Sequence, residues 1–124
     1  MRTNAGRDFQ ARVMGDPASG AEGVYSAAAT IALSTNGDAP DEDNTALPGR
    51  ITEGGLAPGL AAYSHTDGTD TYTLTRSFTF PSSVTIQKVG VEQPDGTLVY
   101  EALLDQPVSG VSGDTVQITV TVTV

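Results

Sequence analysis

The segment QITVTVTV, residues 117–124, alternates strictly between polar and apolar side chains. This period of two predicts a β-strand with one buried face, formed by Ile118, Val120, Val122 and Val124. The segment is also uncharged, rich in β-branched residues and free of Pro and Gly, so it can pair with any open sheet edge. We therefore expect the fold or a second chain to cover this strand.

Turn signals divide the rest of the chain into further strands. Asp67-Gly68 and Asp95-Gly96 supply the residues with positive φ that tight hairpin turns need. Alternating apolar runs separated by such signals are found at residues 24–33, 60–65, 71–80, 82–93, 97–104 and 115–124. Six short strands with little helix predict an all-β fold, an antiparallel β-sandwich of jelly-roll type.

Two other segments complete the predicted organisation. Residues 1–23 form an N-terminal arm, in which residues 4–15 are a weak helix candidate because of Gly6 and Gly15. Residues 24–124 form the sandwich domain, which includes a long acidic loop at residues 34–59. Loops of this length inside a domain are usually functional or mobile, and its apolar stretches ALPGRI and GGLAPGL are expected to lie across the sheet.

The arm carries half of the basic residues of the chain. We interpret it as a docking arm for an acidic neighbour such as a sister subunit, and a frayed tail is the alternative. Its candidate contact residues are Arg2, Arg7, Phe9 and Arg12. Further interface candidates are Thr119 and Thr121, on the outward face of the last strand, and Arg76, which shares a face with apolar residues of its strand. Because an unpaired buried charge is costly, Arg76 must pair with a carboxylate, lie at a solvent-exposed end of the sheet or lie at a subunit contact.

Net charge limits the partners of this chain. It carries 15 Asp and Glu against 6 Lys and Arg, a net charge of −9, and Lys88 is the only lysine. Binding to phosphate backbones needs clustered basic residues, so we expect no nucleic-acid partner. An acidic surface repels anionic membranes, and no apolar run approaches the ~18 residues of a membrane helix. The acid excess is typical of a protein of concentrated salt, where the Debye length is ~3 Å, and an ordinary acidic bacterial or viral protein is the alternative.

Few residues offer catalytic or metal chemistry. His65, Ser64 and Asp67 lie within one turn, whereas a catalytic triad draws its groups from separate elements. No nucleophile-elbow, zinc-protease or phosphate-loop motif occurs, and Cys is absent, so we expect no enzyme and no cofactor. Weak metal candidates are three acidic loop residues, Asp38, Asp41 and Asp43, although acidic runs are usually solvated.

The order of several motifs resembles a family of virion structural proteins of tailed viruses. The matching motifs are TALPG at 45–49, GLA at 55–57, the turn at 63–69, the strand at 71–78 and the stretch VSGDTVQITVT at 111–121. The chain departs from the pattern at Pro58 and at the short, polar VEQPDG turn. The resemblance covers most of the chain. It implies a β-domain of a capsid or tail without catalysis.

Together with the acid excess, the resemblance points to a virus of a halophilic archaeon. We expect a non-enzymatic structural component of the virion, located on the capsid as a decoration or vertex turret, or on the tail. Its expected partners are copies of itself in a symmetric homo-oligomer and other virion proteins. The alternative is a carbohydrate- or receptor-binding module on a virion or cell surface. Only 6% of residues are aromatic and Trp is absent, which does not favour a sugar-binding surface of exposed aromatic rings.

Overall fold

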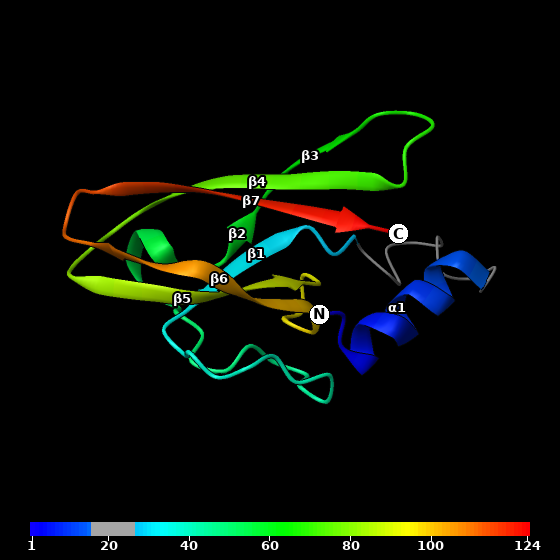
Figure 1. The fold of residues 1–124 in the computed structure, drawn as a ribbon, viewed down its shortest axis with the longest axis horizontal. Helices are drawn as coiled ribbons and strands as arrows, with labels where there is room; N and C mark the ends of the chain where they lie inside the picture. The colour runs from blue at the N-terminus through cyan, green and yellow to red at the C-terminus, as the bar shows by residue number, and fades with distance from the viewer. Residues whose placement is uncertain (16–26) are drawn as a thin grey trace.

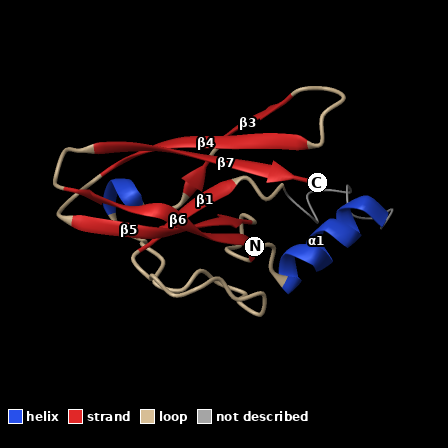
Figure 2. Ribbon diagram, viewed as in Figure 1, coloured by secondary structure: helices blue, strands red, loops and turns tan. Residues whose placement is uncertain are grey.

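Two antiparallel β-sheets form the framework of the computed structural model, which describes residues 1–15 and 27–124 (Figure 1). Sheet A has the strand order β2-β1-β5-β6 and sheet B the order β3-β4-β7. The elements are α1 (Asn4–Gly15), β1 (Thr30–Ser34), the 3-10 helix η1 (Gly54–Leu56), β2 (Gly59–Leu60), β3 (Ala62–His65), β4 (Thr71–Thr79), β5 (Val84–Glu92), β6 (Leu98–Gly110) and β7 (Thr115–Thr123). The predicted all-β, sandwich-like fold is confirmed (Figure 2).

The main core lies between the two sheets. Alternation places one face of each strand inward, and the buried side chains from both sheets form one cluster, which includes Ile31, Leu33, Leu74, Phe78, Ile86, Val91 and Ile118. On β7, Ile118 and Val122 are buried and Val120 is half-buried, as the alternation predicts. Val124 was predicted to be buried and is instead 72% exposed, because β7 ends one residue earlier.

Several strand boundaries differ from the prediction. The predicted first strand at 24–33 is observed from Thr30, and residues 24–26 lie outside the described residues, as does the arm segment 16–23. Residues 60–65 divide between β2 and β3, so the chain changes sheets at Ala61. β6 continues to Gly110, through a stretch that was predicted as a turn. Pro107 is compatible with this extension because β6 is an edge strand.

A register shift interrupts the pairing of β5 with β6. It falls between Ile86 and Lys88, where the switch of apolar phase along β5 predicted a β-bulge. The partner of Ile86 is Val108 and the partner of Lys88 is Leu103, so the additional residues belong to β6, at positions 104–107. Ile86 and Val89, which lie on either side of the shift, both belong to the main core.

The long loop crosses the outer face of sheet A and forms a second, smaller core. Leu47 from the loop packs with Ala32 and Leu98, and all three are buried. Arg50 at the end of the loop donates two hydrogen bonds, both 2.9 Å, to the carboxylate of Glu92 on β5. Burial opposes the charge on Arg50, but the hydrogen bond to Glu92 dominates and raises the pKa of the guanidinium. The expectation that ALPGRI lies across the sheet is therefore confirmed. GGLAPGL does not lie across it: this stretch forms η1, whose Leu56 joins the main core, and β2 of sheet A.

A fully buried ion pair lies beneath the same loop. Lys88 Nζ is 2.8 Å from Glu101 Oε2, and the two side chains are 1% and 0% exposed. The loop completes the site: Asn36 accepts a hydrogen bond from Lys88, while the side chain of Asn44 and the backbone N–H of Asp41 donate to Glu101. The only lysine of the chain therefore has a structural partner in the fold.

The N-terminal segment packs against the first half of β6. Arg2 forms an antiparallel bridge with Tyr100, and the backbone N–H and carbonyl groups of Glu101 pair with Met1. Thr3 is fully buried and has two roles. Its hydroxyl donates to the carbonyl of Leu98 and accepts from the N–H of Gly6, which caps the start of α1.

Candidate functional site

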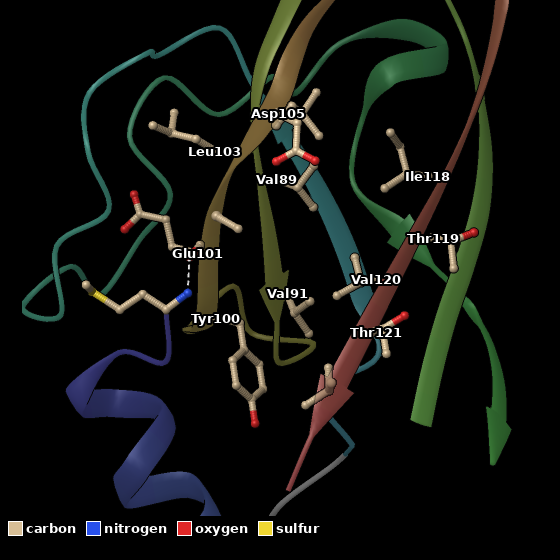
Figure 3. A pocket seen from close by; sticks show the side chains of 14 residues that line it. Val89, Val91, Tyr100, Glu101, Leu103, Asp105, Ile118, Thr119, Val120 and Thr121 are labelled. Carbon is tan, nitrogen blue, oxygen red and sulfur yellow. Dashed lines mark hydrogen bonds between the residues drawn. The ribbon is translucent and has the colours of Figure 1, made fainter. Parts of the chain in front are cut away.

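A groove lies between β6 and β7, the edge strands of the two sheets on the same side of the sandwich. Figure 3 shows the two strands on either side of the groove, with Val91 from β5 and Val120 from β7 pointing into it. On the opposite side, the chain itself links the sheets as it passes from β2 to β3. Between β6 and β7, no strand of the described residues closes the sandwich, and the two strands are joined at one end by the turn at 111–114.

The groove has a volume of about 330 Å³ and a mainly apolar floor. Buried Val89, Val91 and Ile118 line it together with half-buried Tyr100 and Val120. Asp105 lies at one end, and the Glu101 side chain points away from the groove toward the loop side (Figure 3). A small-molecule site has several polar groups that converge on a ligand. Here the conspicuous polar feature is the backbone at the edge of β7 that faces away from β4.

The direction of the β7 backbone groups follows from its pairing with β4. The N–H of Val124 donates a hydrogen bond to the carbonyl of Asp70, and the N–H of Phe80 donates one to the carbonyl of Asp114. These two bonds show, at both ends of the strand pair, which residues of β7 are hydrogen-bonded to β4. Residues with even numbers therefore exchange hydrogen bonds with β4. Backbone groups of the odd residues point to the open edge, and these residues are Thr115, Gln117, Thr119, Thr121 and Thr123.

The edge of β6 is protected, in contrast to that of β7. Residues 1–3 pair with its first half, and its second half carries the bulge at 104–107, which includes Asp105 and Pro107. Bulges, prolines and charges on an edge all discourage pairing with another strand. β7 has nine residues without charge, Pro, Gly or register shift, so of the two edges beside the groove it is the one that can accept a partner strand.

The predicted interface residues lie in three places. Thr119 and Thr121 lie on the exposed outer face of β7, next to the groove. Arg2, Arg7, Phe9 and Arg12 belong to the N-terminal segment that packs against β6, and Arg76 lies on the inner face of β4. The structure therefore groups the N-terminal candidates together and the two threonines together, but it does not bring all seven residues into one surface.

Two N-terminal arginines have partners within the chain. Arg7 forms an ion pair of 3.0 Å with Glu42 of the long loop, and Arg2 donates a hydrogen bond to Gln10. Phe9 and Arg12 line a small pocket of about 260 Å³ against the turn between β5 and β6. Docking of this segment to another molecule stays a prediction, because these contacts are made with its own domain.

Arg76 is held by neutral groups. It donates a hydrogen bond of 3.0 Å to the carbonyl of Leu60, and its guanidinium lies 5.4 Å from the ring centre of Phe78. Gly59 leaves space for the guanidinium, because a Cβ at that position would overlap it. Within the described residues, Arg76 forms no ion pair, and its Nε atom is buried without a hydrogen bond.

The weak metal and catalytic candidates have other local contacts. Asp41 accepts a hydrogen bond from the N–H of Asp43, and Asp38 exchanges two hydrogen bonds with Asn36, so these residues shape turns of the loop. No group of three or more His, Asp or Glu side chains gathers as a metal site in residues 1–15 and 27–124. His65 Nδ1 lies 2.7 Å from the carbonyl oxygen of Thr71, across the turn from β3 to β4.

Comparisons with known proteins identify no relative. The chain matches no protein-family model, no curated protein and no solved structure. In the part of the chain that the structure describes, no helix is long and apolar enough to cross a membrane. The function of this chain is therefore inferred from its sequence and from the geometry of the groove between β6 and β7.

The groove was not predicted from the sequence. Alternation assigns faces within a strand, but it does not say which strands lie at sheet edges. A signal was nevertheless present in β7, whose lack of charge predicts that another strand covers it. The structure shows that no strand of the described chain does so on the side away from β4.

Proposed function

We propose that this chain is a non-enzymatic structural component of a tailed-virus particle that assembles as a symmetric homo-oligomer. The observation that carries the proposal is β7, a nine-residue uncharged edge strand that is open beside an apolar groove. Natural monomers usually block such edges, because they promote pairing between chains. The virion setting rests on the motif resemblance, and location on the capsid or the tail is equally compatible with it.

The alternative, a carbohydrate- or receptor-binding module, has weaker support. Among the described aromatic side chains, Tyr63 is the one that is largely exposed, at 64%, and its ring packs against Tyr72 with centroids 5.7 Å apart. A single exposed aromatic ring offers little surface on which a sugar could stack. Specific binding on a glycan array by the monomeric chain would favour this alternative over assembly.

The mass of the purified chain in solution tests the proposal. We expect sedimentation equilibrium to give a defined oligomer at micromolar concentration in molar NaCl. The oligomer should weaken at low salt, because two chains of charge −9 then repel each other over a longer distance. A strict monomer in molar NaCl, up to the highest soluble concentration, would contradict the proposal.

A further inference from the structure

The open edge of β7 is self-complementary. Its five outward-pointing residues are spaced evenly around Thr119, the midpoint of the strand. If two copies of β7 run antiparallel with Thr119 opposite Thr119, all five outward residues form hydrogen-bonded pairs. On the inner face, Ile118 then lies opposite Val120 of the second copy, and Val116 lies opposite Val122. Cross-strand pairs of β-branched residues stabilise such a ladder.

We propose that β7 pairs with β7 of a second copy of this chain, around a two-fold axis at Thr119. The two copies of sheet B then form one continuous sheet with the order β3-β4-β7-β7-β4-β3. This inference rests on the proposed self-assembly and adds the surface and the register. A closed two-fold contact uses the same patch on both copies and leaves no further β7 edge open.

The groove supports a second copy as the partner. The partner strand presents alternate Val and Ile side chains toward the same side as Ile118 and Val120, where they cover the mouth of the groove above half-buried Tyr100 and Leu104. The pairing thus combines backbone hydrogen bonds with burial of apolar surface, as in other cases of strand addition.

Charge also favours contact at this strand. Each chain has a net charge of −9, so most approaches between two copies bring carboxylates together. Residues 115–123 carry no charged side chain, and the outer face of β7 has four threonines and Gln117. Threonines directly opposite each other can exchange hydroxyl hydrogen bonds across the new ladder, as Thr75 and Thr119 do at 3.4 Å within one copy.

Single-cysteine variants test the register directly, because the chain contains no cysteine. In the proposed pairing, the two Thr119 Cα atoms lie about 5.5 Å apart, within the range of a disulfide. The two Thr123 Cα atoms lie eight positions apart along the strands, about 27 Å. We expect Thr119→Cys to form a covalent dimer on mild oxidation in molar NaCl. The matched control Thr123→Cys should stay uncrosslinked.

A proline variant tests the edge without introducing charge. The N–H of Thr119 points away from β4, so Thr119→Pro removes no hydrogen bond from the ladder of its own chain. It does remove two hydrogen bonds from the proposed dimer, one for each copy. We expect the dissociation constant of the oligomer to rise at least about tenfold, with the circular dichroism of the monomer retained.

The outcomes separate this inference from the proposed function. If the unmodified chain is an oligomer but Thr119→Cys does not crosslink, the interface lies elsewhere and the β7 pairing is wrong. Crosslinking of Thr123→Cys in preference to Thr119→Cys would overturn the register. A wild-type chain that is monomeric throughout would overturn the assembly itself. If Thr119→Pro does not fold, the two cysteine variants, which add no backbone constraint, still decide the question.

Discussion

Replacing Lys88 with alanine is expected to lower the free energy of unfolding by about 3–5 kcal/mol, because it leaves the buried carboxylate of Glu101 without a counter-charge. The effect should be large because neither side chain of the pair reaches solvent. Asn44 and the N–H of Asp41 still donate hydrogen bonds to Glu101, but both are neutral groups. Urea unfolding followed by circular dichroism measures the difference.

A double variant provides the control for this prediction. Lys88→Met together with Glu101→Leu removes both charges and keeps similar volumes, so most of the lost stability should return. If Lys88→Ala alone costs less than about 1 kcal/mol, which is typical of a surface pair, the buried position of this ion pair would be contradicted.

The same site gives the fold a dependence on acid pH. Burial raises the pKa of Glu101, but hydrogen bonds from Lys88, Asn44 and the Asp41 backbone outweigh burial and lower it below its ordinary value of 4.5. Since the folded state binds the proton less readily than the unfolded state, this contribution is present above pH 4.5 and is lost as the pH falls through the lowered pKa. Lys88→Ala should reduce this acid dependence.

Gly6→Ala is expected to lower the free energy of unfolding by about 1–3 kcal/mol, although alanine favours helix by about 1 kcal/mol. A Cβ on Gly6 would overlap the backbone carbonyl oxygen of Val99, and a backbone atom of a paired strand cannot move aside easily. The change therefore separates α1 from β6 and disturbs the contacts that Thr3 makes with both. Thermal unfolding of the variant measures the loss.

Gly15→Ala is the matched control, because Gly15 lies at the other end of α1. A Cβ added there meets none of the described atoms within 4 Å outside its chain neighbours and its own helix backbone. It should leave stability unchanged or raise it slightly through helix propensity. Equal effects of the two substitutions would contradict the close packing of α1 on β6.

The all-β class and most of the strands could be predicted because alternation is a local property of the sequence. β4 and β7 lie where the period of two places them, and the change of phase in β5 indicates the register shift at Gln87. The extension of β6 through Pro107 could not be predicted, because a proline is tolerated only where the strand lies at an edge. Edge positions depend on the whole topology.

The contacts on the outer face of sheet A also could not be predicted from local sequence patterns. Lys88 and Glu101 are 13 positions apart and meet only after β5 and β6 pair with a shifted register. A partial signal was present, since a lysine among apolar residues on both faces of a strand must find a partner if the strand is buried. For the candidate site, β7 was recognisable from the sequence. The groove and the contact of residues 1–3 with β6 were not.

Residue-by-residue amide hydrogen exchange on β7 tests the central claim, that a second chain pairs with this edge. β4 protects the amides of Val116, Ile118, Val120 and Val122 in any state of assembly. In molar NaCl at oligomer-forming concentration, we expect the alternate amides of Gln117, Thr119 and Thr121 to be protected as well. Exchange of these three amides at the rate of free solvent-exposed backbone, while their neighbours remain protected, would contradict it.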